Sequence, residues 1–250
     1  PAGPPRSQVS SPDPVITVAS YDRGPVDMHV HLVGNGLGGN GCWLKPGFMH
    51  RLLADWMLKQ IGLPVSWEAP GFDEAYVSLL VGWLRESAIS HAVLLAHEEV
   101  YDEHGKKLAF GSFYIPNDYL FAVCREHPEL LPAVSIHPAR PDALEELDRC
   151  LEAGAVMMKC LPNCHNIDTR LPRYRRFWER MADAGLPLLA HTGGEHHHAH
   201  DRFGIDTAAI ADNPHVAFKR CHSLGQNARC ARMQAQFIDN GGVALNHGNP

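Results

Sequence analysis

The sequence lacks several features that would place it at once in a common class of protein. Its 250 residues contain no apolar run near the roughly 20 residues that a membrane-spanning helix needs, and its start does not resemble a signal peptide. Basic residues are not in excess, because 22 Lys and Arg stand against 28 Asp and Glu, for a net charge of -6. A chain without a positive field suits neither nucleic acid nor an anionic membrane, so we expect a small-molecule substrate.

The cysteines lack the spacing of a disulfide framework. Seven of them, an odd number, are scattered along the chain without a Cys-x-x-Cys pair. Free thiols of this kind are typical of a reducing compartment, so we predict a cytoplasmic protein. The chain also lacks an initiator methionine, since it begins at Pro1, and we expect a fragment or a processed chain.

Short apolar runs alternate with helical patterns along most of the chain. The runs have the length of strands, and the helical stretches between them carry apolar residues at helical spacing, one of them with Asp73 and Glu74 in its first turn. We predict strands at 26–31, 91–97, 131–137, 155–159 and 186–191, and helices at 48–61, 73–87, 117–127, 142–153 and 172–184. Strands that alternate with helices form a mostly parallel sheet.

Each of these strands ends in a polar residue that could take part in binding or catalysis, namely His31, His97, His137, Lys159 and His191. In a doubly wound sheet, ligands contact mainly the strands beside the switch point. In a (β/α) barrel, every strand delivers its C-terminal residue to one shared mouth. The pattern therefore favours an α/β fold of the TIM-like barrel type, in which a sixth strand is recognisable beyond these five, a seventh is possible and the last is not evident.

The predicted domain organisation is simple. Residues 1–20 are rich in Pro, Ser and Gly and are expected to form a flexible tail. Residues 21–250 are expected to form the barrel, with an insertion at about 34–88 that serves as a lid or an oligomer contact, and an atypical region at 196–250. A homo-oligomer is therefore one expected assembly.

The segment from Val26 to His31 carries the clearest chemical signal. Alternate side chains of an extended strand point to the same face, so His29 and His31 project together. Neutral imidazoles are ligands of zinc and its neighbours, and the glycines that follow from Gly34 open the strand end to solvent. A metal-binding pair and a half-buried strand that carries two histidines by chance both fit this spacing.

In combination, the motifs resemble the amidohydrolase superfamily of metal-dependent hydrolases, in its amidohydrolase-related branch. The resemblance rests on 27–31, on 154–162 around Lys159, and on 188–195 around His191, and it extends over about 26–195. It implies a distorted (β/α) barrel and a divalent metal, zinc first, as one or two ions, with manganese or iron as alternatives.

The resemblance also implies the metal ligands. His29 and His31 match the first-strand ligands, His191 matches the fifth-strand ligand, and His222 matches the sixth-strand ligand. Lys159 matches a lysine that many members carboxylate to bridge two metals. A protonated lysine cannot bind a metal, and burial beside one disfavours the charged form; a solvated or salt-bridged lysine is the alternative.

The eighth-strand aspartate of the family, a metal ligand and general base, is not found, so the catalytic residue is unknown. Asp206, Asp212 and Asp239 all fall in predicted helices or loops. The chain is therefore expected to be truncated, or altered in reading frame near the histidines of 196–200. Those histidines form either an extra metal-binding loop or a surface loop with adventitious affinity for nickel or zinc.

The resemblance implies hydrolysis of an amide, ester or lactone bond of a small molecule by a metal-activated water. A metal-dependent decarboxylase is the alternative within the superfamily, and Lys159 favours hydrolysis over it. An inactive or truncated barrel that only binds metal is an alternative of another class. His97 and His137 are candidates for substrate binding at the mouth, or else core histidines bonded to the backbone.

Overall fold

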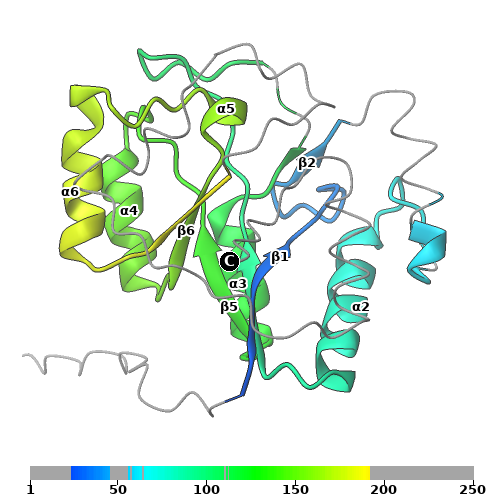
Figure 1. Ribbon diagram of the computed structural model, residues 1–250. Helices are drawn as coiled ribbons and strands as arrows, with labels where there is room; N and C mark the ends of the chain where they lie inside the picture. The colour runs from blue at the N-terminus through cyan, green and yellow to red at the C-terminus, as the bar shows by residue number, and fades with distance from the viewer. Residues whose placement is uncertain are drawn as a thin grey trace, which may run out of the picture.

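The computed structural model describes residues 24–45, 56, 58–63, 65–109, 111 and 113–191. Five strands form one sheet in the order β1-β3-β5-β6-β7, and every neighbouring pair is parallel. Their bounds are Val26–His31 for β1, His91–Leu95 for β3, Leu130–Val134 for β5, Met157–Cys160 for β6 and Leu188–Ala190 for β7. Each predicted strand in this region is therefore present, and strands that follow one another in the chain lie side by side (Figure 1).

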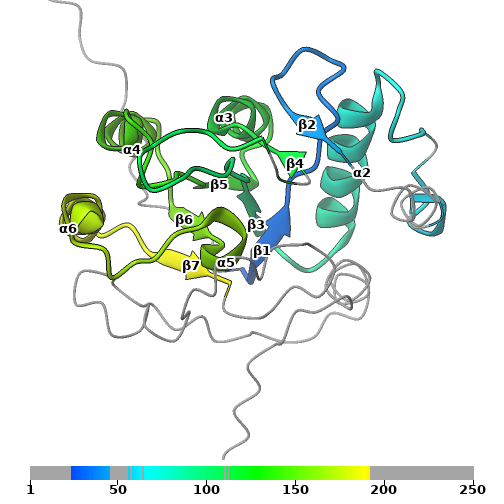
Figure 2. The same ribbon diagram turned by 90° about the horizontal axis from the view of Figure 1, so that it is seen from above.

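Four helices lie in an arc outside the sheet, as the view from above shows (Figure 2). They are α2 (Phe72–Glu86), α3 (Asn117–Glu126), α4 (Ala143–Glu152) and α6 (Arg175–Asp183). The short helices α5 (Pro162–His165) and η1 (Pro172–Tyr174) join β6 to α6. Gly154 and Gly185 follow α4 and α6 with φ of 92° and 64°, the left-handed conformation that ends helices and that glycine adopts without steric cost.

The sheet is buried on both faces, as the continuous apolar run of β3 predicts. Ala92 and Leu94 of β3 pack in the cluster that faces the helices, whereas Val93 and Leu95 pack in the cluster on the inner face. In β6 the same alternation places Met158 outward and Met157 inward. Lys159, one strand position after Met158, belongs by this alternation to the inner face.

The sheet is strongly curved. Strands β1 and β6 are separated by β3 and β5, so in a flat sheet they would lie about 14 Å apart, at about 4.8 Å per strand. Yet the Nζ of Lys159 on β6 lies 3.4 Å from the Nε2 of His29 on β1. Only a sheet that closes around its inner face brings these side chains together, and this curvature, with the helices outside, is that of a (β/α) barrel.

Three elements of the structure have no counterpart in the predictions. Trp43–Leu44 (β2) and Phe113–Tyr114 (β4) form an antiparallel ribbon, and α5 follows β6 directly. Within the predicted insertion at 34–88, α2 packs its apolar side in the main core, so it belongs to the helix layer of the barrel. A lid or an oligomer contact stays a prediction for the residues before α2.

Several predictions fall outside the described residues. They concern the tail at 1–20, the region 196–250 with its histidines, and most of the helix predicted at 48–61, of which Trp56 and residues 58–60 are described and helical. Among the described residues, no helix is both long enough and apolar enough to cross a membrane. The five cysteines in this part of the chain are free thiols.

Candidate metal centre

A β-bulge turns the two histidines of β1 into the barrel. The pairing of β1 with β3 shifts register between Asp27 and Val30, and a bulge re-aims the side chains that follow it. Met28 packs with the inner cluster, whereas Val30 packs with the outer one. The Oδ1 atom of Asp27 accepts a hydrogen bond from the backbone N–H of His29 at 3.0 Å, which satisfies an amide inside the irregular stretch.

The imidazole rings of His29 and His31 are in contact and tilted relative to each other. Their Nε2 atoms lie 3.0 Å apart, and their ring centroids are separated by 4.9 Å. Burial, together with the smaller effects of the positive charges of Lys159 and His191, lowers the pKa of His29 to about 3. The pKa of His31 lies well below its usual range, mainly because of burial. Both rings are therefore neutral at physiological pH, the form in which imidazole binds a metal.

Lys159 and His191 complete the group. Lys159 is 2% exposed, and its Nζ lies 3.4 Å from the Nε2 of His29. His191 follows β7 directly, and its backbone N–H donates to the carbonyl of Cys160 at 2.9 Å. Its charge acts on both His29 and His31. The structure thus brings together four of the five residues that the sequence predicts as ligands; the fifth, His222, lies outside the described residues.

The donor set fits a divalent transition metal. Two nitrogens 3.0 Å apart can both lie at the roughly 2.0–2.1 Å that zinc–imidazole bonds require. Within the described part of the chain, no three side chains of the His, Cys, Asp and Glu types converge on one point. The donors in direct contact are therefore two imidazoles and the Lys159 amine. We call His29, His31 and Lys159 the metal claw.

His137 has a different environment, although it also follows a strand. Its Nε2 donates to the carbonyl of His165 at 2.6 Å, and its Nδ1 accepts from the backbone N–H of Ala139 at 3.0 Å. These two bonds define the tautomer of the ring. Burial lowers the pKa of His137 to about 4. Neither ring nitrogen is left for a substrate, so the geometry supports the alternative, a core histidine bonded to the backbone.

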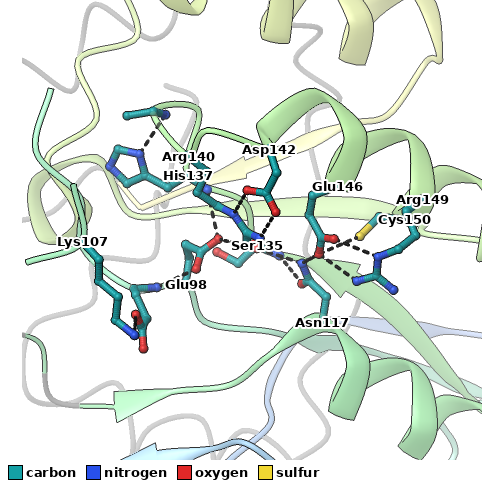
Figure 3. A network of polar contacts seen from close by, with 12 residues as sticks. Glu98, Lys107, Asn117, Ser135, His137, Arg140, Asp142, Glu146, Arg149 and Cys150 are labelled. Carbon is teal, nitrogen blue, oxygen red and sulfur yellow. Dashed lines mark hydrogen bonds and ion pairs between the residues drawn. The ribbon is translucent and has the colours of Figure 1, made fainter. Parts of the chain in front are cut away.

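The loops around His137 are held by buried charges (Figure 3). Glu98 accepts hydrogen bonds from the backbone N–H of His137 at 3.2 Å and from the guanidinium of Arg140 at 3.0 Å. Arg140 also forms a two-pronged ion pair with Asp142. Burial raises the pKa of Glu98, and Arg140 opposes that shift. The arrangement fixes the chain after β5, so these charges serve structure.

One family model matches most of the chain. The model is described as Amidohydrolase, and it matches residues 26–229. The chain belongs to the amidohydrolase family. This confirms the resemblance inferred from the motifs around the claw residues. A comparison with curated proteins finds no match.

A comparison with solved structures also finds matches, three of which are as follows. An uncharacterised TIM-barrel protein from Bordetella bronchiseptica is 18% identical, with a TM-score of 0.49 over 78% of this chain and 65% of that one. A 4-oxalomesaconate hydratase from Rhodopseudomonas palustris is 14% identical, with a TM-score of 0.41 over 67% and 52%. An amidohydrolase II is 16% identical, with a TM-score of 0.40 over 75% and 56%. The chain thus spans between about half and two thirds of these structures.

This amidohydrolase has a second histidine pair at the same end of its sheet. His97, two residues after β3, and His165, at the end of α5, place their Nε2 atoms 3.3 Å apart. The ring of His97 stacks on Phe113 of β4, with centroids 3.8 Å apart. His97 is half-buried, so the prediction that it contacts substrate stands as a proposal.

The glycines after the claw match a dinucleotide-binding spacing but do not form that site. Gly34, Gly36 and Gly39 follow the pattern G-x-G-x-x-G. In dinucleotide-binding folds this loop opens a helix whose N-terminus holds the pyrophosphate. Here the chain continues through turns into β2, so the loop offers no helix N-terminus to a phosphate.

Proposed function

We propose that this amidohydrolase uses a divalent metal, zinc first, to hydrolyse an amide, ester or lactone bond of a small molecule. His29, His31, Lys159 and His191 would hold the metal. The observation that carries the proposal is the contact of Lys159 with His29 across two intervening strands. This contact places an amine nitrogen beside two neutral imidazoles, and nitrogen donors of this kind suit zinc and its neighbours.

The residues of the claw suit this chemistry. A divalent metal bound there would lower the pKa of a water from 15.7 to about 7 and polarise the scissile carbonyl. The two imidazoles are neutral, so each keeps a lone pair for a bond to the metal. Lys159 contributes either its neutral amine or, once carboxylated, two oxygens. The inner face around them is lined by Val93, Leu95 and Met157, apolar side chains that limit access of bulk water.

The buried lysine favours hydrolysis over decarboxylation. A decarboxylase of the superfamily manages with one metal and without such a lysine, as the resemblance implies. The general base remains unassigned, since the aspartates considered for that role lie outside the described residues. An inactive barrel that only binds metal is the alternative, and turnover of any ester, lactone or amide would exclude it.

The first test is the metal content of the purified chain by elemental analysis. We expect about one to two ions of zinc, manganese or iron per chain. The double variant His29→Ala/His31→Ala should lose them, whereas replacing the histidines at 196–198 and 200 by alanine should not. His91→Ala/His127→Ala is the matched control, because it removes two histidines at the opposite, N-terminal end of the strands.

Two results would contradict the proposal. One is metal that is lost only when the histidines of 196–200 are replaced, and the other is equal loss in the control pair. With a claw-dependent metal established, the chain would be assayed with esters, lactones and amides beside aromatic carboxylic acids. Loss of carbon dioxide without hydrolysis would favour the decarboxylase.

A further inference from the structure

A buried tyrosine of α2 contacts the backbone of the second claw histidine. Tyr76 is 4% exposed, and its hydroxyl donates to the carbonyl oxygen of His31 at 2.8 Å. Burial raises the pKa of Tyr76, so the hydroxyl keeps its proton and remains a donor. The end of β1 is thereby tied to the helix layer as well as to β3.

A buried carboxylate one helical turn earlier holds the loop that leaves His31. Asp73 is 1% exposed. Its Oδ1 accepts from the backbone N–H of Asn35 at 2.6 Å, and its Oδ2 accepts from the backbone N–H of Gly36 at 3.2 Å and from the Asn40 amide at 2.6 Å. Hydrogen bonds to an ionised carboxylate are about twice as strong as neutral ones. Three donors therefore fix the loop on this side chain.

Two glycines of the loop lie close to neighbouring atoms. Gly36 has a φ of 76°, and a Cβ atom there would lie 1.8 Å from the carbonyl oxygen of Cys42. A Cβ at Gly34 would lie 3.2 Å from the Asp73 carboxylate. The Asn35 amide donates to the carbonyls of Trp67 and Ala69 at 2.7 Å each. The loop is thus packed against both the start of α2 and the turn before it.

Helix α2 is in turn fixed to the outer face of the sheet. Asp73 and Tyr76 are three residues apart, so they lie on the same side of the helix. Tyr76, Leu80 and Leu84 are buried in the core cluster that also contains Leu94 of β3. The position of the His31 backbone is therefore set by a helix that the core holds in place.

We propose that Asp73 and Tyr76 are positioning residues of the metal claw. They touch neither the imidazoles nor any reacting atom; they act through the backbone of His31 and of residues 35–36. Without them, the distance between the two Nε2 atoms would vary, and the metal would bind more weakly. Groups outside the ligands commonly change metal affinity by 10–100-fold. This inference rests on the proposed function, since it takes the claw to be the metal site.

The first experiment compares Tyr76→Phe with Tyr174→Phe. Tyr174 is also a fully buried tyrosine, 2% exposed, but it lies in η1 and its ring packs in the core near α6. Both variants carry alanine at the histidines of 196–198 and 200, so that only the claw competes for metal. The zinc dissociation constant is measured by chelator competition, and the free energy of unfolding by urea titration of the metal-free protein.

We expect Tyr76→Phe to weaken zinc binding about tenfold. Asp73→Asn should weaken it more, because the new amide nitrogen would face either the N–H of Asn35 or the donors of Gly36 and Asn40. Tyr174→Phe should change zinc affinity less than about twofold at a similar loss of stability. A purely structural role would move stability in both tyrosine variants and zinc affinity in neither. Equal zinc affinity in wild type and Tyr76→Phe would overturn the proposal.

A second measurement needs no metal. Amide hydrogen exchange of the metal-free protein should accelerate at Leu32 to Gly36 in Tyr76→Phe and Asp73→Asn, but not at β5, because only the anchored segment opens. Unchanged exchange at these amides would overturn the positioning role. If His29→Ala/His31→Ala retains all of its zinc, the proposed function fails, while the exchange data still decide whether α2 holds this segment.

Discussion

The half-buried His29–His31 pair and the fully buried His137 lie at the same end of one sheet, yet their nitrogens face different partners. In the pair, nitrogen faces nitrogen at 3.0 Å. In His137, each nitrogen faces a backbone group of the opposite kind. A nitrogen bonded to the backbone stabilises the fold, whereas two Nε2 atoms that face each other can both turn a lone pair to a cation placed between them. A histidine that could bind a metal is therefore distinguished from a structural one by the partners of its ring nitrogens. Its position at a strand end does not make this distinction.

The contrast between His137 and the His29–His31 pair is tested most directly by removing each ring from the metal-free protein. His137→Ala leaves the buried carbonyl of His165 and the N–H of Ala139 without their partners, so we expect the free energy of unfolding to fall by about 4 kcal/mol. His29→Ala removes a ring whose Nε2 faces the Nε2 of His31, and it should cost about 1 kcal/mol. Urea titration measures both. Equal losses would mean that the claw histidines are as structural as His137.

The dependence of stability on pH tests the structural role of His137. The pKa of His137 is lowered to about 4 from the usual 6.5, so between these values the unfolded chain binds a proton that the folded protein does not. Stability is therefore full above pH 6.5 and falls as the pH approaches 4, by about 3 kcal/mol from this ring. His137→Gln should lose correspondingly less between pH 7 and pH 4 in urea titrations. Parallel curves for wild type and variant would contradict the neutral, buried ring.

A substitution of Lys159 tests whether this residue serves the metal claw or the core. Lys159→Met removes the amine beside His29 but keeps an unbranched side chain of similar length, so the free energy of unfolding of the metal-free protein should change by about 1 kcal/mol or less. Zinc affinity should nevertheless fall at least about tenfold, because a ligand is lost. Chelator competition and urea titration separate the two effects. A variant that loses stability but keeps its zinc affinity would place Lys159 with His137.

The smallest effect is expected at His97. His97→Phe keeps an aromatic ring against Phe113, so the free energy of unfolding should change by less than about 1 kcal/mol. If His97 contacts substrate, the variant raises KM more than it lowers kcat once a substrate is known. His97→Ala, which removes the stacking as well, is the control. An unchanged KM in both variants would exclude the contact.

The sequence predicts the barrel because its periodic signals are strong. Five strands and four of the helices fall where apolar runs and helical spacing place them, since each is long enough to repeat its pattern. The ribbon of Trp43–Leu44 with Phe113–Tyr114 consists of two-residue strands, which are too short for any period. It depends on pairing between segments far apart in the chain, and no local pattern reports such pairing.

Part of the site could also be predicted from the periodicity of the sequence. The period of two in β1 places His29 and His31 on one face, and the structure brings them together with Lys159. The bulge that turns this face inward is not visible in the sequence, because it arises from pairing with β3. Asp73 fits a helix N-terminus by its position alone, and its bonds to Asn35 and Gly36 are tertiary. Tertiary contacts of this kind can be identified only from the three-dimensional structure.

The contact of Lys159 with His29 also has a consequence for the order of folding. The two residues are 130 positions apart in the chain, and within the described sheet the strands that carry them are linked through β3 and β5. Contacts of such high sequence separation form late, because the entropy of closing the loop must be overcome before they are made. Zinc uptake during refolding would therefore lag behind helix formation and report the moment at which the curved sheet closes.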